Sequence, residues 1–202
     1  MKKILILALS ILNFGCRAQS QIINILDKNG TTITDAYYQD SDFLLNQFEG
    51  NYLYTNGTTS LNIVLVKKVM QYTTDCYQDL IIGEYHYIEN GVEKINTLLD
   101  LENPYLDQRM HQIDGNKLLS NNKIPRCPEC EPNEWRLRAS FIDPLRNQYG
   151  TMITRKIIYS GQEAIKVHLK MTGTTTLWID GQPQPPTDFT VPAGEYILIK
   201  QP

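Results

Sequence analysis

The stretch that decides the fold is Leu80-Ile81-Ile82-Gly83-Glu84-Tyr85-His86-Tyr87-Ile88, followed by Glu89-Asn90-Gly91 and then by Val92 to Thr97. Apolar, β-branched and aromatic residues crowd the first run, which is typical of a strand. An Asn-Gly pair between two strand-like runs is a strong hairpin signal, because both turn positions need a positive φ that these residues tolerate. The stretch therefore predicts an antiparallel hairpin.

The same signals repeat on both sides of this hairpin. Asn56-Gly57 and Ser160-Gly161 each separate two strand-like runs. After Ser160-Gly161 apolar and polar residues alternate, which predicts a strand with one buried and one solvated face. Further strands are expected at Leu177 to Ile179, before an Asp180-Gly181 turn, and at Glu195 to Lys200. The chain thus predicts a mainly β fold, an antiparallel meander of about eight or nine strands.

A meander of this kind has exposed edges unless it closes on itself, and closure into a barrel removes them. A two-sheet β-sandwich is the alternative. A short helix is expected before the first strand, with Ser41 as its cap and Gly50 at its end. Its apolar residues are Phe43, Leu44 and Phe48.

The segment Phe48-Glu49-Gly50-Asn51-Tyr52 resembles the Gly-X-Trp opening of lipocalin-type barrels, with Tyr52 in the place of the Trp. The resemblance implies a lipocalin-like barrel that the chain enters from a short helix. A barrel of about eight strands is either filled by its own side chains or holds one small ligand. A simpler interpretation is that Gly50 only ends the helix.

Three longer stretches carry a second resemblance: Tyr52 to Ser60, Ile82 to Gly91 and Pro192 to Tyr196. They are similar to a family of small exported proteins from flavobacteria-type bacteria that is classed only as a domain of unknown function. The resemblance implies residence in the cell envelope and no assigned activity.

The N-terminus predicts export. Lys2 and Lys3 precede an apolar run from Ile4 to Leu12, and small residues follow, so residues 1–18 have the pattern of a secretory signal peptide. The apolar run is shorter than the ~20 residues that a transmembrane helix needs. We therefore expect an exported protein of the periplasm or the outer membrane.

Two processing outcomes are open for this segment. Gly15-Cys16 resembles the junction that is cut in bacterial lipoproteins, which leaves acyl chains on Cys16 as a membrane anchor. A cut after Ala18 instead releases a soluble protein that starts at Gln19. The lipoprotein is favoured, because a cysteine at the end of a signal core is otherwise an unusual choice.

The remainder is long enough for one domain with a substantial core. Residues 19–41 read as a polar leader, and residues 42–202 as a single β-barrel domain. Within it, residues 101–134 are rich in Pro, Asn, Asp and Glu and predict a long loop with at most one helical turn, around Leu106 to Ile113. Loops of this length are often functional.

Charge argues against nucleic acid as a partner. The chain has 19 lysines and arginines and 22 acidic residues; without Lys2 and Lys3 the net charge is about −5. Phosphate binding requires clustered basic residues instead. The sequence also has no Ser-centred elbow, phosphate-binding Gly loop or His-Glu-X-X-His helix, so it indicates no enzyme class and no cofactor.

Cys127-Pro128-Glu129-Cys130 is the sharpest chemical motif. A zinc site needs four ligands, and Cys76 and His111 complete the set only if the fold brings them close, so no metal is expected. A thiol redox pair belongs at a helix start, and the surrounding glutamates disfavour a thiolate. The favoured interpretation is a disulfide between Cys127 and Cys130 that pins the loop, with Cys76 buried as a small apolar residue.

Other polar and aromatic candidates have ordinary explanations as surface or core residues. Glu84 and Glu93 flank the hairpin and face either one another or solvent. The histidines are scattered: His86, His111 and His168. The two tryptophans, expected in the core or as pocket lining, are Trp135 and Trp178.

These observations predict a non-catalytic cell-envelope lipoprotein, attached to the membrane through Cys16, whose barrel binds a small apolar ligand. Two alternatives from other classes stay open. One is a protein-interaction or structural module that uses residues 101–134. The other is a thiol redox enzyme that uses Cys127 and Cys130.

Overall fold

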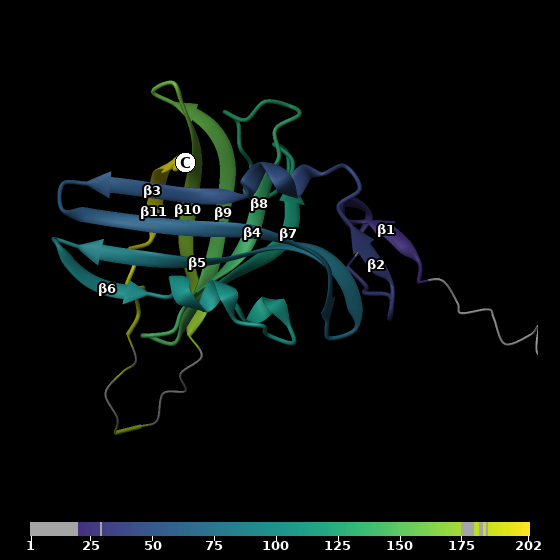
Figure 1. The fold of residues 1–202 in the computed structure, drawn as a ribbon, viewed down its shortest axis with the longest axis horizontal. Helices are drawn as coiled ribbons and strands as arrows, with labels where there is room; N and C mark the ends of the chain where they lie inside the picture. Colours follow the sequence, from purple (N-terminus) through teal and green to yellow (C-terminus); the bar gives the residue numbers. More distant parts are fainter. Residues whose placement is uncertain (1–19, 29, 175–179, 182–183, 185) are drawn as a thin grey trace, which may run out of the picture.

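The computed structural model describes residues 20–28, 30–174, 180–181, 184 and 186–202 (Figure 1). Eight antiparallel strands form a barrel, and three further strands are added to it, so the predicted barrel is confirmed. The barrel strands are β3 (Gly50–Asn56), β4 (Thr59–Thr73), β5 (Cys76–Glu89), β7 (Ile113–Leu119), β8 (Arg136–Asp143), β9 (Gln148–Tyr159), β10 (Gln162–Thr174) and β11 (Gly194–Lys200). The added strands are β1 (Ile22–Asn24), β2 (Tyr37–Gln39) and β6 (Val92–Asn96).

The tight turns lie where the sequence predicted them. Asn90 and Gly91 have φ values of 52° and 77°, and Ser160 and Gly161 have 50° and 79°. Two consecutive residues with positive φ form the turn that matches the right-handed twist of a hairpin. Gly57 likewise lies in the turn between β3 and β4.

Two seams close the meander into a barrel. The strand order is β5-β4-β3-β11-β10-β9-β8-β7, and β7 returns to pair with β5. The β3–β11 seam pairs Leu53 with Ile199 and Tyr52 with Lys200, and the β5–β7 seam pairs residues 81–83 with residues 113–115. In Figure 1, β3, β4 and β5 cross the view while β8, β9 and β10 run down it, as two walls of one barrel.

One edge of β5 is shared by three short strands. β2 pairs with it at Tyr77 and Gln78, β7 at Ile81 to Gly83, and β6 at His86 to Glu89. β7 pairs with β5 only as far as Gly115, so its remaining residues lie beside the 3₁₀ helix η2 (Ile25–Asp27) instead. This gap between β7 and the N-terminal strands is the position of the groove described below.

The interior of the barrel is filled by its own side chains. Tyr85 stacks on Phe141 with ring centroids 4.6 Å apart, and both side chains are fully buried. The 3₁₀ helix η3 (Leu44–Phe48) adds Leu45 and Phe48 to the same core where β3 begins. At the opposite end, where β8 turns into β9, Phe189 packs edge-on against Phe141. Both ends of the core are therefore covered.

The expected helix before the first strand is a five-residue 3₁₀ helix, η3, whose N-cap residue is Phe43, and Asp40 rather than Ser41 accepts hydrogen bonds from its first N–H groups. The Asp40 carboxylate accepts hydrogen bonds from the backbone N–H groups of Leu44 and Leu45, at 2.8 Å and 2.9 Å. A carboxylate accepts several bonds at once and also pairs with the Lys67 ammonium group at 2.7 Å. A single Ser hydroxyl accepts fewer hydrogen bonds and carries no charge to pair with Lys67.

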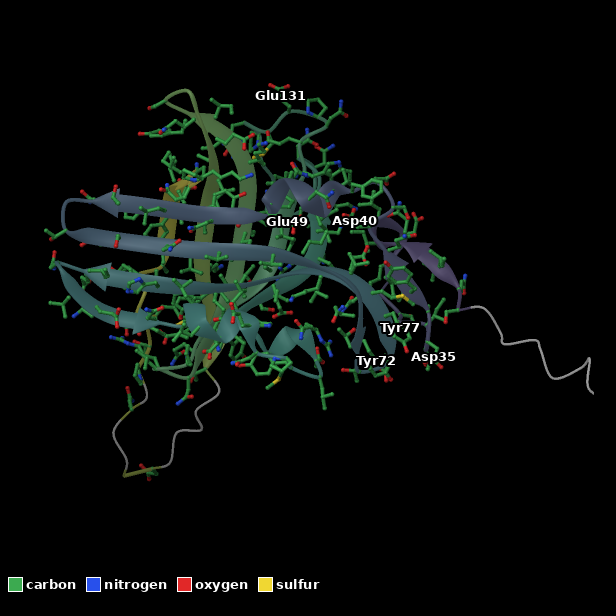
Figure 2. All side chains as sticks on the ribbon, viewed as in Figure 1. Asp35, Asp40, Glu49, Tyr72, Tyr77 and Glu131 are labelled. Atoms are coloured by element: carbon green, nitrogen blue, oxygen red, sulfur yellow. A yellow bond between two sulfur atoms is a disulfide. The ribbon has the colours of Figure 1, made fainter. Side chains whose placement is uncertain are left out.

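The segment read as a polar leader contains two strands, β1 and β2, which extend the sheet from the free edge of β5. Buried Asp79 holds β2 in place, since it accepts hydrogen bonds from the Tyr37 hydroxyl at 2.6 Å and the Asp40 N–H at 2.9 Å. Figure 2 shows Tyr72 and Tyr77 together at the tip of the β4–β5 hairpin, close to Asp35 beside β2.

Residues 101–134 are not one long loop, because β7 lies within them. The predicted helical turn is present as η5 (Gln108–Met110), after η4 (Leu98–Glu102). Gly115 within β7 permits close packing against β8: a Cβ there would lie 2.8 Å from the Ala139 Cα. Residues 1–18 with Cys16, the expected strand at Leu177 to Ile179, and Trp178 lie outside the described residues.

Candidate functional site

The segment between β7 and β8, residues 120–135, is the disulfide loop. Cys127 and Cys130 are bonded to each other, with their Cα atoms 5.3 Å apart, as the sequence predicted. Cys76 is a free, buried cysteine on β5. No group of three or more His, Cys, Asp and Glu side chains in the described part of the chain is arranged to hold a metal ion.

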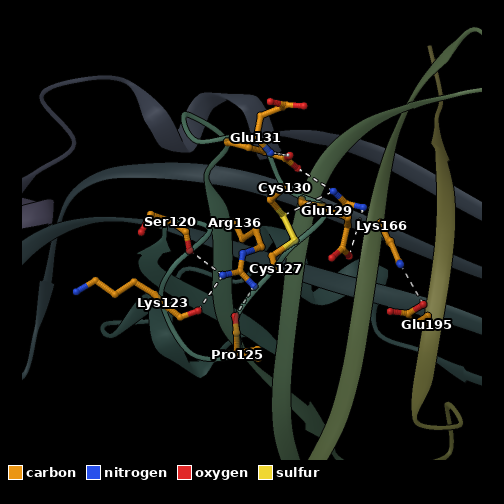
Figure 3. The surroundings of a disulfide bond; sticks show 12 residues. Ser120, Lys123, Pro125, Cys127, Glu129, Cys130, Glu131, Arg136, Lys166 and Glu195 are labelled. Carbon is orange, nitrogen blue, oxygen red and sulfur yellow. Dashed lines mark hydrogen bonds and ion pairs between the residues drawn. A yellow bond between two sulfur atoms is a disulfide. The ribbon is translucent and has the colours of Figure 1, made fainter.

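Arg136, the first residue of β8, holds this loop in place through hydrogen bonds to its backbone (Figure 3). Its guanidinium group donates to the Pro125 carbonyl at 2.7 Å, to the Ser120 carbonyl at 2.7 Å and to the Lys123 carbonyl at 3.1 Å. Arg136 is only 4% exposed, and burial lowers the pKa of its guanidinium group. The loop is thus folded around one buried cation as well as around a disulfide.

On one side of the loop lies a small cleft of about 170 Å³ over the outer wall of β9, β10 and β11. Two of its cations have carboxylate partners: Arg155 pairs with Glu134 at 3.3 Å, and Lys166 pairs with Glu195 at 3.1 Å. Arg155 also lies 3.6 Å from the Cys130 sulfur atom. No helix begins at Cys127 in the structure, so the cysteine pair lacks the helix N-terminus that activates a thioredoxin-like thiol.

On the other side lies a groove of about 590 Å³, which we call the β7 groove. It fills the gap where β7 separates from β5, and the disulfide loop forms one of its walls. Ser120 and Lys123, whose carbonyls Arg136 holds, both line it. Its other lining residues are Ile25, Leu26, Lys28, Gly30, Asn116, Lys117, Leu118, Leu119 and Trp135.

Polar contacts at the base of the groove join its two walls. The Gln78 side-chain carbonyl accepts hydrogen bonds from the Lys28 ammonium group at 3.2 Å and from the Asn116 amide at 3.0 Å. Lys28 also lies over the Tyr38 ring, 4.8 Å from its centroid. The groove therefore has a fixed shape, which favours binding because little must be ordered on association.

The two glutamates singled out in the sequence do not face one another. Each pairs with a histidine. Glu84 lies 2.8 Å from the Nδ1 atom of His111, and both side chains are fully buried. Glu93 lies 2.7 Å from the Nε2 atom of His86 on the surface. His168 lies 3.8 Å from Glu195 and is exposed.

The buried pair is enclosed between the outer face of β5 and the segment that carries η4 and η5. Burial raises the pKa of the Glu84 carboxyl group, while hydrogen bonds, including one from His111, act in the opposite direction. Neither the second Glu84 oxygen nor the His111 Nε2 atom has a hydrogen-bond partner in the described part of the structure. Neither side chain of the pair is exposed to solvent in the structure.

Sequence reasoning found the disulfide but missed the β7 groove. The groove is assembled from three separate segments, around residues 25–30, 116–123 and 135, and no spacing along the chain brings them together. Trp135 was noted as a core or pocket residue, and the structure places it at the groove. Trp135 was therefore the one residue that could have indicated the groove from the sequence, and its half-buried position between the loop and β8 is visible only in the structure.

A model of a family of unknown function, DUF6705, matches residues 1–201. The chain belongs to this family. Membership in DUF6705 confirms the expected relation to a family of unknown function and assigns no activity. Neither the curated proteins nor the solved structures compared with the chain include a match. In the described residues, no helix has the length and apolar character needed to cross a membrane.

Proposed function

We propose that this DUF6705 protein is a non-catalytic cell-envelope lipoprotein that binds a small apolar ligand in the β7 groove. The groove itself is the observation that carries the proposal. Its volume of about 590 Å³ falls in the range of small-molecule sites, ~300–1,000 Å³, and apolar walls with a few polar groups are typical of such sites.

The sequence predicted a ligand in the barrel interior, and we now place it in the β7 groove instead. The interior is occupied by side chains such as Tyr85, Phe141 and Ile165, none of them more than 1% exposed. A ligand there requires these side chains to move, and removing buried packing costs several kcal/mol. The groove is open without such a change.

Two features support the envelope assignment. Residues 1–18 have the pattern of an export signal with a lipoprotein-like Cys16. The Cys127–Cys130 disulfide suits an oxidising compartment outside the cytoplasm. The nine peptide links from Cys16 to Ile25 span roughly 30 Å at most, so an anchor at Cys16 would keep the groove close to the membrane surface.

The groove proposal is tested with the neutral apolar fluorophore N-phenyl-1-naphthylamine. The chain has two tryptophans, so a Trp178→Phe background leaves Trp135 as the sole donor for energy transfer to a probe in the groove. Leu26 lies on the groove wall and is 39% exposed, so Leu26→Ser should weaken binding about tenfold while the protein stays folded.

The matched control is Leu106→Ser, because Leu106 is fully exposed and does not line the groove. Affinity should not change in this variant. Absence of probe binding by the parent protein would overturn the proposed function. Binding that Leu26→Ser leaves unchanged would overturn the site.

The anchor is tested separately by intact mass spectrometry of the protein from its own membrane fraction. A lipoprotein carries the mass of acyl chains on a chain that begins at Cys16. A Cys16→Ser variant should move to the soluble fraction. An unmodified chain that starts at Gln19 would overturn the lipid anchor and leave the groove proposal standing.

An interaction module is a second candidate, because the segment before β7 exposes large apolar side chains. Leu106 is 100% exposed and Met110 is 62% exposed. Limited proteolysis with and without envelope extract tests this candidate. Protection of residues 101–112 only in the presence of extract supports a docking role, and equal cleavage in both samples contradicts it.

A further inference from the structure

We infer that the β7 groove binds a single-chain amphiphile with an anionic head group, of the fatty-acid class. This inference rests on the proposed function and adds the chemical class of the ligand and the residues that recognise it. Three lysines, Lys28, Lys117 and Lys123, line the groove, and no aspartate or glutamate does.

The lysine cluster stands out against the rest of the molecule. The chain as a whole is acidic, with a formal net charge of −3. In the cleft on the other side of the disulfide loop, Arg155 and Lys166 are each paired with a glutamate. Lys117 and Lys123 form no ion pair with any residue that the structure describes. Two cations without carboxylate partners in a concave site favour a bound anion.

The lysines and the apolar residues line the same groove. Lys117 and Leu118 come from β7, where they point to opposite faces of the strand, and Lys123 and Trp135 both belong to the disulfide loop. Ile25 and Leu26 of η2 face them from the opposite wall. A ligand with an alkyl chain and one terminal negative charge satisfies both parts of this lining. A fully polar anion would leave the apolar wall uncovered.

Alternative sites for the anion are less suitable. Arg136 is buried, and its two terminal guanidinium nitrogens already donate to three backbone carbonyls. Lys28 is held by Gln78 and by the Tyr38 ring, so it contributes positive charge from a fixed position at the base. Lys117 and Lys123, both exposed, are the residues free to contact a head group at the mouth of the groove.

Decanoate and decanol distinguish charge recognition from apolar binding, because they share an alkyl chain and differ in the head group. Binding of each is measured by isothermal titration calorimetry on the folded, disulfide-bonded protein. Decanoate should bind about tenfold more tightly than decanol, and this preference should shrink as salt is added.

The decisive variant is Lys117→Gln/Lys123→Gln, which should weaken decanoate binding about tenfold and leave decanol binding unchanged. Lys170→Gln is the matched control, since Lys170 is an exposed lysine on β10 outside the groove. Thermal unfolding of each variant verifies that the fold is intact.

The possible results separate the two proposals. Preference for decanoate that the double variant abolishes and the Lys170→Gln control retains supports the inference. Equal binding of both probes, unaffected by the lysine variants, overturns the anionic head group and leaves the apolar site in place. Failure of both probes to bind overturns the inference together with the proposed function.

Discussion

At the scale of single residues, the Glu84–His111 pair is the most unusual feature of this protein. Both side chains are fully buried, and one nitrogen and one oxygen atom of the pair lack partners in the described structure. Ionised groups rarely occur in such surroundings unless they are fully hydrogen-bonded, because removal from water costs several kcal/mol. The pair should therefore make stability depend on pH.

The direction of this dependence follows from the raised pKa of Glu84. The folded state binds the proton more tightly than the unfolded chain, whose carboxyl has the ordinary pKa of 4.5. The resulting stabilisation is complete below that pKa and is lost as pH rises through the folded-state pKa. Glu84→Gln keeps the shape of the side chain and removes the titration.

We predict that Glu84→Gln gains stability relative to the parent protein, by about 1–3 kcal/mol, once the pH rises above 4.5, the ordinary pKa of the carboxyl group. Urea unfolding at several pH values measures it. Glu93→Gln is the control, because Glu93 pairs with His86 on the surface with 60% of its side chain exposed. Parallel stability profiles for Glu84→Gln and the parent would contradict the prediction.

At the scale of elements, two interactions of different strength hold the disulfide loop in place: the Cys127–Cys130 bond and the hydrogen bonds of Arg136. The Cys127–Cys130 bond closes a ring of only a few residues, since the sequence separation is 3, so it restricts the unfolded chain little. The loop-entropy relation gives about 2 kcal/mol for a loop of this size. Arg136 instead satisfies three backbone carbonyls from inside the loop.

We therefore predict that Arg136→Met destabilises the protein more than the double variant Cys127→Ser/Cys130→Ser. The arginine variant should lose about 3–5 kcal/mol, because the charged hydrogen bonds of a buried guanidinium group to three backbone carbonyls are lost. The serine variant should lose about 2 kcal/mol. Denaturant unfolding followed by Trp135 fluorescence compares them.

Arg138→Met is the control for this comparison, because Arg138 is exposed and lies two residues further along β8. It should change stability by less than about 0.5 kcal/mol. A serine variant that unfolds before Arg136→Met would show that the disulfide, rather than the buried arginine, is the main support of the loop.

The elements also show what the sequence could and could not predict. Asn90-Gly91 and Ser160-Gly161 predicted their hairpins because a positive φ at both turn positions is a local requirement. β7 was missed because Gly115 is needed for close packing against β8, a contact that no local pattern reports. The β7 groove was missed for the same reason, since Lys28, Lys117 and Trp135 meet only in the fold.

At the scale of the whole molecule, the barrel consists of long hairpins joined by short seams. β4 pairs with β5, and β9 with β10, along most of their length. β3 and β11 are paired only through Leu53 with Ile199 and Tyr52 with Lys200, and the Gln201 N–H extends the seam by a bond to Asn51. The β5–β7 seam is similarly short. The barrel should therefore open first at the β3–β11 and β5–β7 seams.

Native-state hydrogen exchange should detect this order of opening. The free energy of local opening is lower where fewer ladder hydrogen bonds must break, so the β11 amides that face β3 should exchange through a sub-global opening, well before the β10–β11 and β9–β10 ladders. The β9–β10 hairpin is the internal control, because its residues 152–154 are buried or half-buried and pair at mid-ladder with residues 167–169. Exchange of all eight strands with one common free energy would show instead that the seams open only on global unfolding.

A ligand in the β7 groove touches β7 and the N-terminal segment rather than β11, so it should slow exchange near β7 and leave the β3–β11 seam unchanged.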